Sequence, residues 1–242
     1  MRIIHMSDLH LTKEGCIWDT DTNLHLEYAI EKIKKIPNID AIVISGDLSN
    51  DGSIETYNRL DGIMASIGVV TYCCPGNHDN LYVFFNQFTP TFLKRDKYAV
   101  IGNWNFFFLN TVVEGMSRGF TNEKDIIILK TEINNSSKNV GIVLHHPPIE
   151  QLGWLNRKLL EDRDKFNEII KKSDKVRMVL YGHTHYHMDR EIGGILYSSA
   201  GSVGFAFDQA LPKFEIAEGR ESFSLITIEN DKIKVENISI YS

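Results

Sequence analysis

The sequence contains few cysteines. Three occur in 242 residues, and two of them, Cys73 and Cys74, are adjacent. Such a set cannot build the disulfide framework of a small secreted protein. We therefore expect a protein that works in a reducing compartment, and we predict a cytoplasmic location.

Long apolar stretches and basic clusters are also scarce. No apolar run in the sequence approaches the roughly 20 residues that cross a bilayer, and the apolar N-terminal segment reaches Asp8 and His10 too soon for a signal peptide. We therefore expect no membrane contact. The formal charge is −6, and Lys and Arg form no dense run. Because nucleic-acid binding depends on positive charge, we expect no nucleic-acid polymer as a substrate.

The apolar pattern of the first half alternates between strand and helix. Short apolar runs over 2–6, 41–45 and 69–73 predict buried strands. Apolar residues at helical spacing over 24–36 and 54–67 predict helices between them. This order favours a parallel sheet flanked by helices.

The second half is richer in strands, with one clear helix predicted over 158–170. Strands are predicted at 105–109, 140–144, 176–181, 195–198, 223–228 and 233–240. The segment 125–133 fits either a helix or a strand. Repeats, low-complexity tracts and obvious linkers are missing from the sequence. We therefore predict one α/β domain over 1–242 that contains two sheets.

Five short polar blocks follow the predicted strands, where α/β sheets place their functional sites. They are Asp8-Leu9-His10, Gly46-Asp47, Gly76-Asn77-His78-Asp79, His145-His146-Pro147-Pro148 and Gly182-His183-Thr184-His185. Residues i and i+2 of an extended segment point to the same side. We therefore expect Asp8 and His10 to reach one site together, and likewise His183 and His185.

The residue types in these blocks indicate metal binding. Imidazole, carboxylate and amide ligands without a thiolate suit Zn, Mn, Fe or Co. Six of the nine histidines lie in the blocks. Two cations held close together need a bridging anion, and Asp47 is the natural candidate. The alternative for each residue taken singly is a polar side chain that caps a strand or a turn.

The order of the blocks resembles that of the calcineurin-like metallophosphoesterases. Within that family it looks most like the class III cyclic nucleotide phosphodiesterases and related glycerophosphodiesterases. The resemblance spans Asp8 to His185 and fades beyond. It implies a four-layer αββα fold, in which two packed mixed β-sheets are flanked by helices and carry two divalent metal ions at the strand ends.

The resemblance also implies a role for each matching residue. For the first metal it implies the ligands Asp8, His10, Asp47 and His185, and for the second Asp47, Asn77, His145 and His183. His78 and Asp79 would be the catalytic residues, with His78 beside the phosphate and Asp79 helping to orient it. His146 stands beside a proposed ligand, and we interpret it as structural or as a residue that contacts the metal ligands.

The implied function is hydrolysis of a small phosphodiester, either a cyclic nucleotide or a glycerophosphodiester. A hydroxide that bridges the two metals would attack phosphorus in line with the leaving group. A protonated His78 would bind the phosphoryl oxygens or give a proton to the departing alkoxide. Two alternatives stay open. They are a phosphomonoesterase or protein phosphatase with the same binuclear centre, and a non-catalytic scaffold, against which the filled ligand positions argue.

Three further expectations concern the neighbourhood of the site. Residues 201–207 read as a loop that lines the pocket. Asn77 is a neutral amide where a carboxylate would bind a hard cation more tightly, so the second metal should be lost more easily than the first. Because members of the family often form dimers, we also consider a homodimer.

Overall fold

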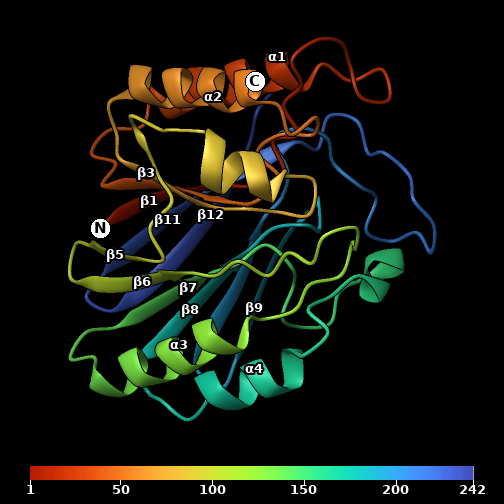
Figure 1. Ribbon diagram of the computed structural model, residues 1–242. Coiled ribbons are helices and arrows are strands. Elements are labelled where there is room, and N and C mark those ends of the chain that lie inside the picture. Colours follow the sequence, from red (N-terminus) through yellow and green to blue (C-terminus); the bar gives the residue numbers. More distant parts are fainter. Residues whose placement is uncertain (242) are drawn as a thin grey trace.

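Two six-stranded sheets pack face to face in the computed structural model, which describes residues 1–241 (Figure 1). The first sheet has the order β12-β11-β1-β2-β3-β4. Its strands are β1 (Arg2–Met6), β2 (Ala41–Ser45), β3 (Thr71–Cys74), β4 (Leu93–Lys94), β11 (Ser222–Glu229) and β12 (Lys232–Ser239). The strands β1 to β4 run parallel, and β11 joins β1 antiparallel.

The second sheet has the order β5-β6-β7-β8-β10-β9, with β6, β7, β8 and β10 parallel. Its strands are β5 (Tyr98–Ile101), β6 (Trp104–Phe108), β7 (Val140–Val143), β8 (Val176–Tyr181), β9 (His187–Ile192) and β10 (Ile195–Ala200). Parallel and antiparallel pairs thus occur in both sheets, as predicted.

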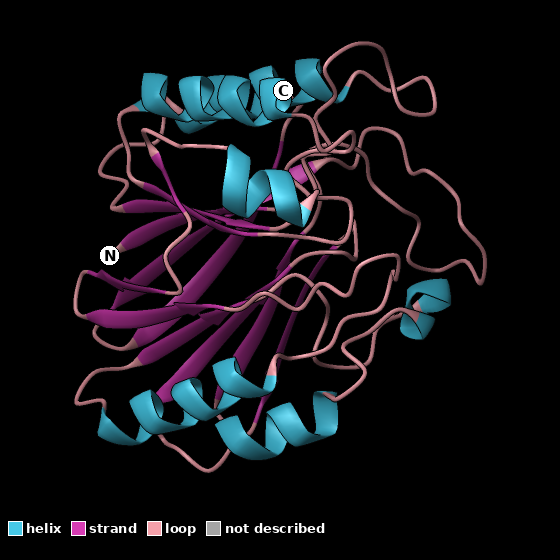
Figure 2. Cartoon of the chain, viewed as in Figure 1, coloured by secondary structure: helices cyan, strands magenta, loops and turns pink. Residues whose placement is uncertain are grey.

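Helices cover the outer face of each sheet, so that the molecule has four layers (Figure 2). The helices α1 (Thr22–Ile33) and α2 (Ile54–Ile67) lie over the first sheet, and α3 (Glu123–Asn135) and α4 (Arg163–Ile170) lie over the second. Alternate residues of a strand serve different layers. In β1, Ile4 packs toward the helices and Ile3 packs between the sheets. The expected αββα architecture is confirmed.

Most predicted elements are present, with shifted ends. The first helix begins at Thr22 because Asp21 caps it by accepting hydrogen bonds from the backbone N–H groups of Asn23 and Leu24. The ambiguous segment 125–133 is part of α3. The last predicted helix begins at Arg163 rather than at 158. The sequence patterns missed three strands and two short helical turns, namely β4, β5, β9, η1 (Val83–Gln87) and η2 (Gly153–Arg157).

The carboxyl ends of the parallel strands of both sheets lie at one edge of the sandwich. Figure 1 shows the long connecting loops gathered at this edge, on the right of the view. Among the described residues, no helix combines the length and apolar character that a membrane crossing requires.

Candidate metal centre

All five polar blocks lie in loops that follow strands. Three leave β1, β2 and β3 of the first sheet, and two leave β7 and β8 of the second. Backbone hydrogen bonds join neighbouring loops of the same sheet. The Asp8 N–H donates to the Gly46 carbonyl at 3.1 Å, the His10 N–H to the Asp47 carbonyl at 2.9 Å, and the Gly182 N–H to the His145 carbonyl at 3.0 Å.

The prediction that the segments 8–10 and 183–185 are extended is wrong. The strand β1 ends at Met6, and Asp8 and His10 have φ angles of 53° and 47°. In the last block, His183 and His185 have φ angles of 68° and 55°. This left-handed backbone is uncommon outside glycine and costs roughly 1–3 kcal/mol per residue. Both pairs of side chains still reach one site, because the turned backbone aims them inward.

Two glycines allow the loops to approach the site closely. At Gly46, which has a φ of 95°, an added Cβ would lie 2.4 Å from His145 Nδ1. At Gly76 it would lie 2.2 Å from Asp47 Oδ1 and 2.3 Å from the Asp47 amide nitrogen. Neither position has room for a side chain.

Replacing Gly76 with Ala is expected to displace Asp47, lower the free energy of unfolding by about 1–3 kcal/mol and reduce metal binding. Gly62 offers a matched control, because it lies within α2 and an added Cβ there meets nothing within 4 Å. Gly62→Ala should raise the free energy of unfolding by about 0.5–1 kcal/mol. Urea unfolding and metal analysis of both variants measure these effects. Equal metal content in the two variants would contradict the prediction.

One group of potential metal ligands joins the two sheets at the base of the site. Its members are the buried residues Asp8, His10, Asp47 and His185. His10 Nε2 lies 3.4 Å from Asp47 Oδ2, and His185 Nε2 lies 3.3 Å from Asp8 Oδ1. Metal–ligand bonds of about 2.0–2.2 Å place neighbouring ligand atoms roughly 3–3.6 Å apart. The spacing of this group therefore suits one cation.

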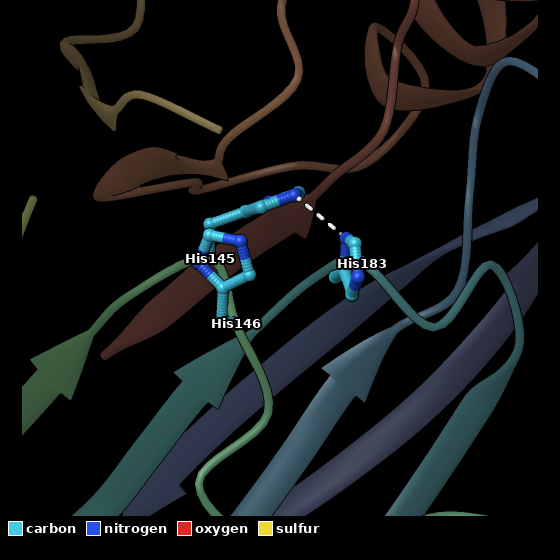
Figure 3. A group of neighbouring side chains, drawn as sticks. All are labelled: His145, His146 and His183. Atoms are coloured by element: carbon cyan, nitrogen blue, oxygen red, sulfur yellow. Dashed lines mark hydrogen bonds between the residues drawn. The ribbon is translucent and has the colours of Figure 1, made fainter. Parts of the chain in front are cut away.

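A second group surrounds His145. Its Nε2 atom lies 3.3 Å from Asp47 Oδ2, 3.1 Å from Asn77 Oδ1 and 3.2 Å from His183 Nδ1. Figure 3 shows the rings of His145 and His183 turned toward each other from their separate loops. The structure thus brings the expected ligands of the second metal together as well.

Asp47 lies between the two groups. Its Oδ1 accepts a hydrogen bond from the His78 backbone N–H at 2.8 Å, which fixes the carboxylate. Its Oδ2 is buried and has no hydrogen-bond partner within residues 1–241, although it lies close to His10 and His145, one from each group. A buried carboxylate oxygen without a partner is costly. A cation on each side of Oδ2 would compensate this cost.

The orientation of three histidine rings prepares nitrogen lone pairs for a metal. Nδ1 of His10 lies 3.1 Å from Asn50 Oδ1, and Nδ1 of His185 lies 2.7 Å from the Phe205 carbonyl. Nδ1 of His145 lies 2.8 Å from the Ser45 carbonyl. Each Nδ1 therefore carries a proton, which leaves Nε2 as the ring nitrogen that can bind a metal.

Two of these lone pairs face each other. Nε2 of His10 and Nε2 of His185 are 3.2 Å apart. Since neither nitrogen has a proton to donate, they repel unless a positive charge lies between them. This contact and the unpartnered Asp47 oxygen show that the side chains fit metal ions.

The pKa values of the proposed ligands are strongly shifted by burial and by their mutual attraction. Burial lowers the pKa of His10 to about 3 and holds the pKa of His183 well below its usual value. Burial alone would raise the pKa of Asp8 and Asp47, but attraction to neighbouring histidines outweighs it and both pKa values are lowered. Burial also opposes charge on His145, yet the attraction of Asp47 raises the pKa of His145 to about 9. Asp8 and Asp47 thus keep their negative charge, which a protonated His145 offsets in part when no metal is bound.

His78 and Asp79 are placed differently. The ring of His78 stands edge-on to that of His10, with 4.7 Å between ring centres, and it lines the cavity above the ligands. Asp79 is buried and accepts hydrogen bonds from the backbone N–H groups of Leu48, Ser49 and Gly76 and from the Tyr57 hydroxyl. These contacts hold the second and third loops together, so we interpret Asp79 as a positioning residue.

His146 lies next to the metal ligands, which agrees with the second of its two interpretations. One of its ring nitrogens lies within 4.8 Å of ligand atoms of His145 and His183. Its Nδ1 is 2.8 Å from the Thr111 hydroxyl, and its Nε2 has no hydrogen-bond partner among the described residues. In Figure 3 its ring lies beside that of His145 and outside the His145–His183 contact.

A cavity of about 280 Å³ opens above the metal ligands. Aromatic side chains from three separate loops line it, and they are Trp18, Trp154, Phe205, Phe207 and Phe214. The expectation that residues 201–207 line the pocket is confirmed. Trp18, Trp154 and Phe214 were not predicted as cavity residues, because no motif or periodicity in the sequence links the segments that carry them.

Comparisons with known proteins agree with this geometry. A 3′,5′-cyclic-nucleotide phosphodiesterase of Nostoc sp. is 28% identical over 95% of this chain and 88% of its own length. A 3′,5′-cyclic adenosine monophosphate phosphodiesterase of Pseudomonas aeruginosa is 24% identical over 88% of this chain and 83% of its own length.

Solved structures share the fold. A dimetal phosphatase from Danio rerio has a TM-score of 0.73 and 11% identity, with 99% of this chain and 96% of that chain covered. GAP50, the anchor in the inner membrane complex of Plasmodium, has a TM-score of 0.69 and 15% identity, with 100% of this chain and 85% of that chain covered. The family model of the calcineurin-like phosphoesterases matches residues 1–187. The chain therefore belongs to the calcineurin-like phosphoesterase family.

Proposed function

We propose that this protein is a phosphodiesterase that hydrolyses a 3′,5′-cyclic nucleotide at a centre of two divalent cations. The observation that carries the proposal is the buried Asp47 Oδ2, which lies 3.4 Å from His10 Nε2 and 3.3 Å from His145 Nε2 and has no hydrogen-bond partner in the described part of the chain. One carboxylate oxygen between two sets of ligands is the arrangement that a bridged pair of cations needs.

The proposed ligands follow the two groups. Asp8, His10, Asp47 and His185 would hold one cation, and Asp47, Asn77, His145 and His183 would hold the other. Because these donors are imidazole, carboxylate and amide, we propose Zn, Mn, Fe or Co as the metals. When bound, two such cations supply an activated water and neutralise the charge of the phosphate oxygens.

The remaining chemistry falls to side chains of the cavity. His78 lines the cavity beside His10, where its ring can bind a phosphoryl oxygen or give a proton to the leaving alkoxide. Asp79 keeps the His78 loop in place through its bonds to the backbone at Leu48, Ser49 and Gly76. Such fixed placement of the reacting groups lowers the entropic part of the barrier.

The relatives support the choice of substrate. Both named sequence relatives are cyclic nucleotide phosphodiesterases, and the matches extend over most of each chain. The cavity of about 280 Å³ suits a small molecule rather than a polymer.

A phosphomonoesterase would use the same metal centre. The experiment therefore compares a diester and a monoester that share the p-nitrophenolate leaving group. Metal-loaded protein should hydrolyse bis(p-nitrophenyl) phosphate and 3′,5′-cyclic nucleotides with a higher kcat/KM than p-nitrophenyl phosphate. A preference for the monoester would favour the phosphatase. The absence of turnover on every phosphate ester would favour a non-catalytic scaffold, since the fold itself is shared with the anchor protein GAP50.

The difference between the two ligand sets predicts two metal affinities. The set around His145 contains the neutral amide of Asn77 and shares Asp47 as its carboxylate, whereas the other set has Asp8 in addition. Titration of metal-free protein should therefore show a tight step followed by a weaker one. Asn77→Asp should tighten the weaker step, because a carboxylate binds a hard cation more strongly. Two equal affinities in the unmodified protein would contradict this expectation.

A further inference from the structure

The cavity above the metal ligands has one polar side and one aromatic side. His10, His78, His183 and Asp47 form the polar side, where a phosphate would lie. We call the aromatic part of the lining the aromatic wall and define it as Trp18, Trp154, Phe205, Phe207 and Phe214. The proposed hydrolysis of a phosphodiester involves only the polar side. It assigns no role to the residues of the aromatic wall.

The wall is continuous with the ligands. Phe205 lies 4.7 Å from the ring centre of His10, and Phe207 stacks on His185 at 4.2 Å with an interplanar angle of 15°. Trp18 is one ring further out, at 5.0 Å from Phe205. In a nucleotide, one ribose ring separates the base from the phosphate. In the cavity, one phenyl ring, that of Phe205, likewise separates Trp18 from the metal ligand His10.

The outer rings of the wall are exposed while the inner ones are buried. Phe205 and Phe207 are 2% and 6% exposed, whereas Trp18 is 55% and Phe214 42% exposed. Phe214 packs against both tryptophans, at 4.8 Å from Trp18 and 5.8 Å from Trp154. Large exposed aromatic rings at the mouth of a cavity are available to stack on a planar ligand.

Lys158 distinguishes between two kinds of ligand. An aromatic cage can hold a quaternary ammonium group, such as choline in a glycerophosphodiester, or a neutral planar base. The Lys158 Nζ atom already lies 5.3 Å above the ring of Trp154 and lines the cavity. A second cation beside it would be repelled, whereas a neutral base with ring nitrogens and carbonyl or amino groups would not.

On these grounds, and resting on the proposed function, we propose that the aromatic wall binds the nucleobase of the substrate, with Trp18, Trp154 and Phe214 as the specificity-determining residues. The wall therefore selects cyclic nucleotides over phosphodiesters without a base. Because stacking tolerates any base, the selection should depend on the presence of a base more than on its identity.

The experiment measures KM and kcat of Trp18→Ala and Phe214→Ala on 3′,5′-cyclic AMP and on the 3′,5′-cyclic phosphate of methyl riboside, which has no base. We expect KM for cyclic AMP to rise about 5- to 150-fold, with a much smaller change for the compound without a base. Trp18→Phe should restore most of the lost affinity. Tyr82→Ala is the matched control, because Tyr82 is 65% exposed and lies outside the cavity lining. Equal losses on both substrates, or no loss, would overturn the proposal.

Binding provides a readout that does not depend on turnover. Of the three tryptophans, Trp18 and Trp154 line the cavity and Trp104 is buried between the sheets. Adenosine 5′-monophosphate should quench the tryptophan fluorescence, and Trp18→Phe should remove a large part of the quenching. If the protein turns over no phosphodiester but shows this quenching, the proposed function fails and the base site stands. If cyclic AMP is hydrolysed without quenching, or glycerophosphocholine is preferred, the base site fails.

Discussion

Replacing Asp47 with Ala is expected to abolish the pairing of the two metals and to lower kcat/KM on bis(p-nitrophenyl) phosphate by about 1,000-fold or more. The physical reason is the position of Asp47 Oδ2, which lies close to His10 of one ligand group and His145 of the other. Its removal takes a ligand from both cations, and metal ions contribute several kcal/mol to stabilising the transition state, about a factor of ten for every 1.4 kcal/mol.

Metal content and activity are measured on the same preparation. Asp231→Ala is the matched control, because Asp231 also has a left-handed backbone, with a φ of 61° against 52° for Asp47, but lies in the turn between β11 and β12. Any strain that Ala introduces at a positive φ is therefore similar in both variants. An Asp47→Ala protein with two equivalents of metal would contradict the bridging role.

Replacing His78 with Ala is expected to lower kcat on a cyclic nucleotide by about 10²- to 10⁴-fold while the metals stay bound. The backbone N–H of residue 78, which holds Asp47 Oδ1 at 2.8 Å, is unchanged by the substitution. If His78 gives a proton to the leaving group, the loss should be much smaller on bis(p-nitrophenyl) phosphate, because p-nitrophenolate departs without a proton.

The comparison of the two substrates separates two roles. Equal losses on both would show that His78 binds the phosphoryl oxygens and does not protonate the leaving group. His78→Asn is a useful second variant, since it keeps a hydrogen-bond donor in a similar place but cannot transfer a proton at neutral pH. A variant that lost metal along with activity would contradict the position of His78 outside the ligand groups.

The positive φ angles of the proposed metal ligands lower the stability of the fold. Of the non-glycine residues with positive φ, five belong to the proposed ligands, and they are Asp8, His10, Asp47, His183 and His185. Each such residue costs roughly 1–3 kcal/mol, which the surrounding fold must offset. The hydrogen bonds that Asp79 accepts from two loops are part of this compensation.

The sequence by itself determined an α/β fold with two sheets and the identity of the polar blocks, whereas the four layers were implied by the family resemblance. Apolar runs such as 41–45 form buried strands because both faces of β2 are covered, one by helices and one by the second sheet. Glycine, aspartate and histidine at strand ends indicated a metal centre, since the chemistry of a ligand belongs to its residue type. Short or half-exposed elements such as β4 and β9 had no apolar pattern that predicts a strand, because they bury few apolar side chains.

Only the tertiary structure decided how the metal ligands converge and which aromatic residues line the cavity above them. The left-handed turns at Asp8 and His183 depend on hydrogen bonds between loops that are distant in sequence, such as the one from the His183 N–H to Asp8 Oδ2 at 2.9 Å. The aromatic wall likewise brings together Trp18, Trp154 and Phe214 from three loops with no shared pattern. Residue type is local information, whereas the meeting of side chains across two sheets is a property of the packed chain.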